Sequence, residues 1–485
     1  MLFRSDSIRL ECAEQVATLW LESDRLTPTV LGDIREAVTT LRQRAWAEVL
    51  LIRTRSRRGF PTRPSLADYE LLSDATARRE FSRLGQETFQ QIAELSPSTR
   101  TIALVEGECV DAGFELTLAC DFRLAVVRPG TRFGVTYLGS GLLPCWGLTQ
   151  RLPRRVGPQR ACDFIEQERL VDARSALKLG LVDHVFGPRM VKSQIWWTIA
   201  EVQDRARWPA RPTVFRRLCD MPWWADRRVF RPRLHRLSSP LARRVIEVMR
   251  TGWREGEAVG LLAERTAFAD AGLHPDVAER RQWAWRFETV QAVWSEVSPP
   301  RSIGLAHWDE SSVQIALAAL AQDQRIALPP CGEGRIEELL RMGVDKGCFS
   351  FLEAGERRRN ISQGQEALAG CDLVFLTGRL AQDRERRVEI ERSLPPETVL
   401  VLVTSVWPSE ITDGCWIYPQ RVVRCDWSWS GIGFRGVRIK TEETTSEWSA
   451  ARLFQWWTQC GFRPVLDGPR GPVPWQSEPL LMPAA

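Results

Sequence analysis

The residues best placed to do chemistry surround Glu115. The sequence predicts an apolar strand over 101–105, a tight turn at 111–113 and a helix over 115–120. A carboxylate at a helix start is stabilised by the helix dipole and can sit there without catalytic duty. It can also act as a general acid or base, because it can hold or release a proton. Both interpretations of Glu115 stay open at this point.

Other side chains that could bind metals or form covalent links are scattered. The twelve cysteines form no C-x-x-C pair, and the chain has only four histidines, at 184, 235, 274 and 307. A zinc site needs clustered soft ligands, so we expect no metal. A disulfide framework is also not expected in a chain this long without a visible export signal.

Composition narrows the class of protein. A chain of 485 residues exceeds one typical core, so two or three domains are expected. Hydrophobic residues make up 44% and charged residues 26%, which excludes a wholly disordered chain. Arginine dominates the basic residues, but acidic residues are interleaved and the net charge is only +5, so we expect no nucleic acid partner. No apolar run approaches the ~18 residues of a membrane span, and we expect a cytoplasmic protein.

Two regions alternate apolar strands with helical patterns, which predicts layered α/β architecture. The first contains predicted strands at 16–21, 49–53, 101–105 and 122–127, with a helix over 31–45. Residues 205–236 read as an irregular connector, and one long helical period follows over 240–269. The second region opens at 302 as a doubly wound parallel sheet, with strands at 302–306, 325–328, 373–376 and 399–403.

The segment from Ala103 to Asp121 resembles the signature of the crotonase (enoyl-CoA hydratase/isomerase) family. In that family a strand ends in a Gly-rich turn, and a helix begins with Glu and closes on Ala-Cys-Asp. The likeness continues in order through Phe133-Gly134, Leu143-Pro144, Gly147, residues 149–157 and residues 176–185. The resemblance implies a β/α spiral fold that binds an acyl-CoA thioester.

The family uses two carboxylates as general acid and base. Glu115 matches the first of them. Counting back from Leu143-Pro144 places Tyr137 at the second. A phenol, with its ordinary pKa near 10, cannot act as a carboxylate base at neutral pH, although it can donate a hydrogen bond.

Two backbone N–H groups polarise the thioester carbonyl in this family. The turn that contains Ala112 and Gly113 matches the first donor, through the N–H of Ala112. The loop that begins at Phe60 matches the second. In one register Pro64 takes the donor position, and proline has no N–H. A shift of one residue gives the role to Ser65, and both registers stay open.

The region from Ser302 resembles the NAD-binding domain of 3-hydroxyacyl-CoA dehydrogenases. It follows the crotonase region as it does in multifunctional fatty-acid oxidation α subunits. The residues that would bind NAD depart from the family. His307, Asp309 and Ser312 stand where three glycines are expected, and Pro329 or Pro330 stands where the ribose acid is expected. The catalytic His and its Glu partner are replaced by Asp426 and Arg438 in the same comparison. We expect neither NAD binding nor dehydrogenase activity.

The prediction is therefore a crotonase-like domain at 7–190, a helical connector at 191–298, a degenerate Rossmann-like domain at 299–470 and a Pro-rich tail at 471–485. We expect an acyl-CoA-binding protein related to the hydratases of fatty-acid β-oxidation, with impaired or altered hydratase chemistry and no cofactor. The alternative is a non-catalytic scaffold or sensor that binds acyl-CoA or a thiolase-like subunit. A homo-oligomer is also open.

Overall fold

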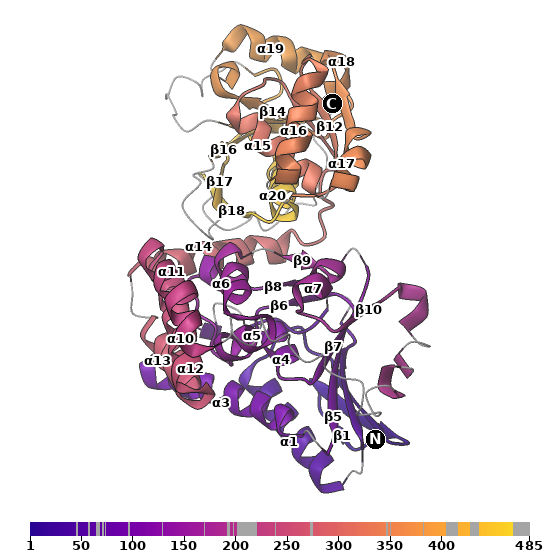
Figure 1. Ribbon diagram of the computed structural model, residues 1–485. Coiled ribbons are helices and arrows are strands. Elements are labelled where there is room, and N and C mark those ends of the chain that lie inside the picture. The colour runs from indigo at the N-terminus through magenta and orange to yellow at the C-terminus, as the bar shows by residue number, and fades with distance from the viewer. Residues whose placement is uncertain are drawn as a thin grey trace. The chain divides into compact units, whose positions relative to one another are not determined.

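The computed structural model describes most of the chain (Figure 1). The described residues are 1–44, 47–56, 59–64, 68–69, 72, 74–95, 98–128, 130–168, 170–191, 195–196, 198–200, 221–237, 239–271, 275–345, 348–349, 351–381, 383–403, 416–426 and 436–468. Ser65 and the predicted tail at 471–485 lie outside these residues. Contacts between residues divide the chain into two compact units, and the second begins at Trp283. The predicted boundaries at 190 and 298 stay predictions.

A seven-stranded sheet forms the centre of the first unit. Its order is β1-β2-β3-β4-β5-β7-β10, and the pairings from β3 through β10 are parallel. Strands β4, β5 and β7 are buried almost throughout, as expected for parallel strands with covered faces. The strands are Phe3–Arg4, Ile8–Ala13, Val16–Leu21, Val49–Thr54, Arg100–Val105, Phe122–Val126 and His184–Phe186 in that order.

A small second sheet positions the predicted turn. It joins β6 (Glu108–Val110), β8 (Arg132–Gly134) and β9 (Val171–Asp172), with β8 in the middle. Helix α4 (Ala112–Leu118) begins directly after β6, so Glu115 lies in its first turn. The helix thus starts three residues before the predicted position, because Asp111 alone makes the bend.

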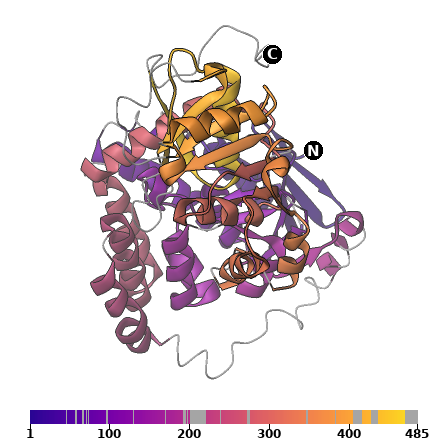
Figure 2. The same ribbon diagram turned by 90° about the horizontal axis from the view of Figure 1, so that it is seen from above.

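The remaining helices pack around these sheets. The predicted single helix over 240–269 is wrong in one respect, because Gly256 breaks it into two. Gly256 has φ +103° and ψ 161°, a conformation that residues with a Cβ rarely adopt. Figures 1 and 2 show the two helices, α12 and α13, side by side. The helices are α1 Pro28–Arg44, α3 Ala75–Ala93, α5 Leu148–Val156, α6 Pro158–Gln167, α7 Ala173–Leu179, α10 Pro222–Ala225, α11 Arg231–Arg236, α12 Pro240–Glu255 and α13 Glu257–Ala271.

The described part of the predicted irregular connector is also helical. Helices α10 and α11 run over residues 222–236, and Asp226–Phe230 between them form a π-helix. Asp226 accepts hydrogen bonds from Arg231 and Arg250, and these contacts fix the segment against α12. Local sequence periodicity misses such a segment because long-range ion pairs and core packing hold it.

In the second unit an eight-stranded sheet has the order β13-β12-β11-β14-β15-β16-β17-β18. All neighbours pair in parallel except β16 and β17. The strands in chain order are Ser302–Leu305, Arg325–Leu328, Ile361–Gln363, Leu373–Thr377, Val399–Val403, Val422–Asp426, Gly436–Lys440 and Arg463–Asp467. Helix α14, Pro275–Val293, begins in the first unit and ends in the second. The other helices of the second unit are α15 Glu310–Ala321, α16 Glu333–Asp345, α17 Phe351–Arg358, α18 Gln365–Leu368, α19 Arg384–Ser393 and α20 Glu447–Gln459. Trp294, Trp456 and Trp457 are fully buried in this unit.

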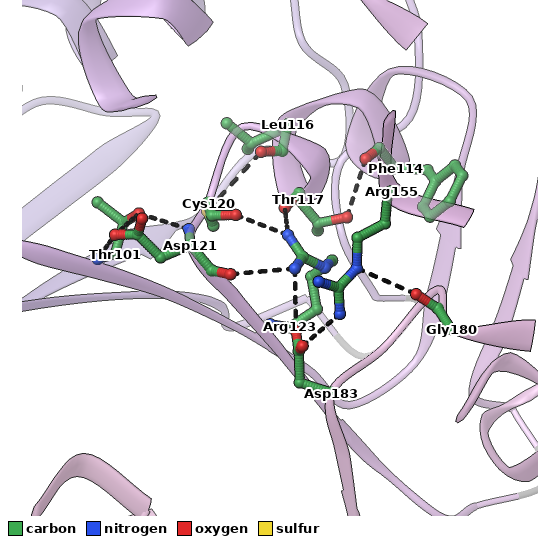
Figure 3. Close-up of polar contacts among 10 residues, drawn as sticks. All are labelled: Thr101, Phe114, Leu116, Thr117, Cys120, Asp121, Arg123, Arg155, Gly180 and Asp183. Carbon is green, nitrogen blue, oxygen red and sulfur yellow. Dashed lines mark hydrogen bonds and ion pairs between the residues drawn. The ribbon is translucent and has the colours of Figure 1, made fainter. Parts of the chain in front are cut away.

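A buried ion-pair network fastens the C-terminal end of α4 to the main sheet (Figure 3). The guanidinium of Arg123 donates to the carbonyl oxygens of Cys120 and Asp121, at 2.6 and 3.0 Å. It also pairs at 2.9 Å with Asp183, which in turn pairs with Arg155. Burial lowers the pKa of Arg123, and the charge of Asp183 opposes that change. Removing Asp183 would leave the Arg123 charge in the core without its ionic partner, and removing Arg123 would leave the buried Asp183 with Arg155 alone.

In the described part of the chain, we find no helix that is both long and apolar enough to cross a membrane.

Replacing Arg123 with Met should lower the free energy of unfolding by about 3–5 kcal/mol, because Asp183 would lose its main buried partner. Urea unfolding followed by circular dichroism measures this loss. Arg83→Met is the matched control: its pairs with Glu80 and Glu87 are exposed, so the loss should stay within ~1 kcal/mol. Equal losses in the two variants would contradict the role given to Arg123.

Candidate functional site

Asp111 forms the bend that leads into α4. It has φ +49° and ψ −118°, a left-handed conformation that favours glycine. Its carboxylate accepts hydrogen bonds from the N–H and hydroxyl of Thr136, at 2.5 and 2.7 Å. Its own N–H donates to the carbonyl of Gly134 at 3.1 Å. These contacts hold the strained turn and thereby fix where α4 begins.

Glu115 is fully buried, and both of its carboxylate oxygens accept hydrogen bonds. The hydroxyl of Tyr137 donates to Oε1 at 2.6 Å. The backbone N–H groups of Trp146 and Leu148 both donate to Oε2 at 2.9 Å. The sequence comparison places Tyr137 opposite Glu115, and the structure brings the two side chains into contact. The contacts with residues 146 and 148 are additional, and they make Glu115 an anchor for the loop before α5.

A second buried carboxylate, which the sequence pattern did not predict, lies next to this loop. Glu264 on α13 accepts hydrogen bonds from the N–H groups of Gly147 and Thr149, at 2.6 and 3.0 Å. It also accepts from the Thr149 hydroxyl and, at 3.2 Å, from the side chain of Gln86. The four donors explain how a charged group can be buried here. The sequence signal that could have indicated Glu264 was a polar residue on the face of a helix that its apolar periodicity places in the core.

The acid–base properties of the site follow from burial. Desolvation and the nearby charge of Glu264 raise the pKa of Glu115 to about 8, against the three hydrogen bonds that lower it. Burial likewise raises the pKa of Glu264 and, with the charge of Glu115, that of Tyr137. Glu115 therefore favours its protonated form at neutral pH, and Tyr137 stays a phenol.

The predicted thioester-binding residues lie at the start of α4 and in the loop facing it. Ala112 and Gly113 are buried. A Cβ on Gly113 would meet the carbonyl oxygen of Pro61 at 2.4 Å, so only glycine allows the loop to approach this closely. Pro64 is buried in the same loop. Ser65 lies outside the described residues, so the register of the loop stays open.

Arg63, which the sequence pattern did not predict as a site residue, brings a buried positive charge to this loop. Its guanidinium donates to the carbonyl of Pro64 at 3.1 Å and to the hydroxyl of Ser140 at 3.2 Å. Nε lies 3.6 Å from a carboxylate oxygen of Asp111. Because Asp111 is also held by Thr136, the guanidinium is fixed beside the residue that precedes Ala112.

A small recess opens next to these residues. Tyr69, Leu142, Leu143 and Phe268 line it, with Arg78 and Arg281. Its volume of about 20 Å³ has room for one water molecule. An acyl group would enter it only if lining side chains moved. In the part of the chain that the structure describes, no group of three or more His, Cys, Asp or Glu side chains is arranged to hold a metal ion.

The raised pKa of Glu115 predicts a pH-dependent stability. The folded state keeps a proton that the unfolded chain releases above its own pKa of about 4.3. The free energy of unfolding should therefore fall as pH rises toward about 8, with a limiting slope of ~1.4 kcal/mol per pH unit. Glu115→Gln, which mimics the protonated acid, should show a flatter curve in urea unfolding from about pH 5 to 8. Parallel curves for the two proteins would contradict this assignment.

Comparison with known proteins shows the family of the chain. Residues 65–211 match the sequence model described as enoyl-CoA hydratase/isomerase. A relative named crotonyl-CoA hydratase, from Syntrophomonas wolfei subsp. wolfei, is 32% identical over 194 residues, which cover 39% of this chain and 73% of the relative.

Solved structures show weaker likeness. An enoyl-CoA hydratase from Bacillus halodurans is 17% identical, with a TM-score of 0.43, covering 57% of this chain and 99% of that one. One from Mycobacterium avium subsp. paratuberculosis is 18% identical, with a TM-score of 0.42, covering 58% and 100%. The assignment of the chain to a family rests on the sequence relative. The chain belongs to the enoyl-CoA hydratase/isomerase family.

Proposed function

We propose that the first unit binds an acyl-CoA thioester and has impaired or altered hydratase chemistry. One observation carries this proposal: the hydroxyl of Tyr137 contacts Glu115 at 2.6 Å, at the position that resemblance to the family assigns to a second carboxylate. Hydration of a double bond needs a base that activates water and an acid that delivers a proton. A phenol with a raised pKa cannot supply the base at neutral pH.

The surroundings of Glu115 support the same proposal. Its oxygens already accept three hydrogen bonds, two of them from backbone N–H groups that cannot move without unwinding the start of α5. The raised pKa lets it deliver or accept a proton near neutral pH, which is enough for a proton shift within a bound thioester. It is not enough to activate a water molecule at the same time.

Hydration of crotonyl-CoA tests this proposal directly. We expect turnover far below the 1–10³ s⁻¹ typical of enzymes, together with measurable binding of crotonyl-CoA by calorimetry. Glu115→Gln should keep the binding, because the amide can accept from the same backbone N–H groups. Fast hydration by the wild-type chain that Glu115→Gln abolishes would contradict the proposal.

A non-catalytic scaffold or sensor is the second candidate. The complete burial of Glu115 between structural donors favours it, because a carboxylate that anchors a loop needs no catalytic duty. The candidates differ in a proton-exchange measurement. Loss of deuterium from the α-carbon of a saturated acyl-CoA indicates an enzyme, and binding without exchange indicates a scaffold. The thiolase-like partner, the homo-oligomer and the cytoplasmic location stay predictions.

For the second unit we propose a Rossmann-like domain that does not bind NAD. Support for the fold comes from the parallel strand order β13-β12-β11-β14-β15-β16, which is the 3-2-1-4-5-6 order of doubly wound sheets. Support for the loss of NAD comes from Asp309. Its carboxylate accepts from the N–H of Ser312 at 2.8 Å and caps α15, where a diphosphate would need the free helix start.

The space around this helix start is also filled. A Cβ added to Gly378, directly after β14, would meet a carboxylate oxygen of Asp309 at 2.6 Å. The carboxylate thus lies between the ends of β11 and β14, the point where strand order reverses and where ligands bind in such sheets. These residues do not fit a dinucleotide.

Isothermal titration of the whole chain with NADH should therefore show no binding heat, and the nicotinamide fluorescence should not change. Asp309→Asn removes the repelling charge but keeps a capping side chain, so this variant should also fail to bind. Micromolar affinity in the wild-type chain would overturn the proposed loss of NAD binding.

A further inference from the structure

The loop at residues 60–64 offers few backbone donors to a thioester. Pro61 and Pro64 have no N–H group. The N–H of Phe60 donates to the carbonyl of Glu108 at 2.7 Å, and the N–H of Thr62 donates to the carbonyl of Asp24 at 3.0 Å. Four of the five residues in this stretch therefore have no backbone donor to give. The same loop nevertheless lies directly against Gly113, at the start of α4.

Arg63 adds a charged side-chain donor at this place. Its side chain is only 8% exposed. A guanidinium is permanently charged and holds its N–H groups in a rigid planar fork. Two of its present acceptors are neutral oxygens, from Pro64 and Ser140, which the oxygen of a bound thioester could replace. Nε of Arg63 forms an ion pair with the carboxylate of Asp111, so the guanidinium would keep its orientation during such an exchange.

We propose that the Arg63 guanidinium, together with the N–H of Ala112, donates hydrogen bonds to the thioester carbonyl oxygen and stabilises the negative charge that develops there. The proposal rests on the acyl-CoA binding proposed above. The proposal also accounts for the strained turn at Asp111, because this residue both precedes α4 and orients the guanidinium of Arg63.

Electrostatics favour this role. A positive charge in a buried site interacts strongly with a developing enolate, since little water screens it. Asp111 neutralises part of that charge when no ligand is bound, which allows the guanidinium to be buried. Burial raises the pKa of the neighbouring Tyr69; the charges of Glu115 and Asp111 add to this rise and that of Arg63 opposes it, so these charges share one environment.

A chromophoric ligand reports polarisation of the thioester carbonyl independently of catalytic turnover. 2,4-Hexadienoyl-CoA absorbs at longer wavelength when donors polarise its carbonyl group. We expect the wild-type chain to bind it with a red shift. Arg63→Met should bind with an affinity changed less than about tenfold, yet lose most of the shift, since the charged donor is gone. Arg63→Lys should keep part of the shift, because an ammonium retains the charge.

Arg233→Met is the matched control. Arg233 pairs with Asp163 and Glu166 between α11 and α6, and its side chain is 13% exposed. This variant loses a part-buried ion pair of similar kind and should keep the full red shift. Should Arg63→Met fail to fold, Asp111→Asn tests the same arrangement, because loss of the orienting charge should also reduce the shift.

The outcomes distinguish the two proposals. No binding of hexadienoyl-CoA by the wild-type chain would overturn the proposed function and this inference with it. Binding without a red shift, or an unchanged shift in Arg63→Met, would overturn the inference and leave acyl-CoA binding standing.

Discussion

Burial of two carboxylates around the loop before α5 is the constraint on which the first unit depends. Glu115 and Glu264 accept hydrogen bonds from the backbone N–H groups of residues 146–149, where a loop becomes a helix. Helix starts carry unsatisfied donors, and here two glutamates from different parts of the chain satisfy them. Burial, together with the nearby charge of Glu264, raises the pKa of Glu115, so the buried position that builds the site also sets its acid strength.

In both units, buried or part-buried acidic side chains accept hydrogen bonds at the start of a helix. In the first unit, Glu115 and Glu264 accept hydrogen bonds from backbone N–H groups at the start of α5. In the second, the Asp309 carboxylate caps the start of α15. In each case an acidic side chain of the protein satisfies backbone donors at a helix start.

The sequence predicts the framework well and the local charges poorly. The strands β3, β4, β5 and β7 match the predicted ranges within one residue, because buried parallel strands give continuous apolar runs. Glu264 could not be assigned, since its partners lie more than a hundred residues away in the chain. Arg63 was hidden for a similar reason: its contacts with Asp111 and Ser140 depend on how the loop folds back. The helix break at Gly256 was missed because the apolar period continues through it.

Helices α12 and α13 are joined to α5 through a very close contact. A Cβ on Gly252 or Gly260 would fall 1.7 or 2.1 Å from the side-chain oxygen of Gln150. The same helix pair carries Glu264 to Gly147 and Thr149. A gene fragment that ends at residue 190 would lack Glu264 and would leave the N–H groups of Gly147 and Thr149 without this acceptor. The segment that carries α12 and α13 therefore completes the hydrogen bonding at the start of α5.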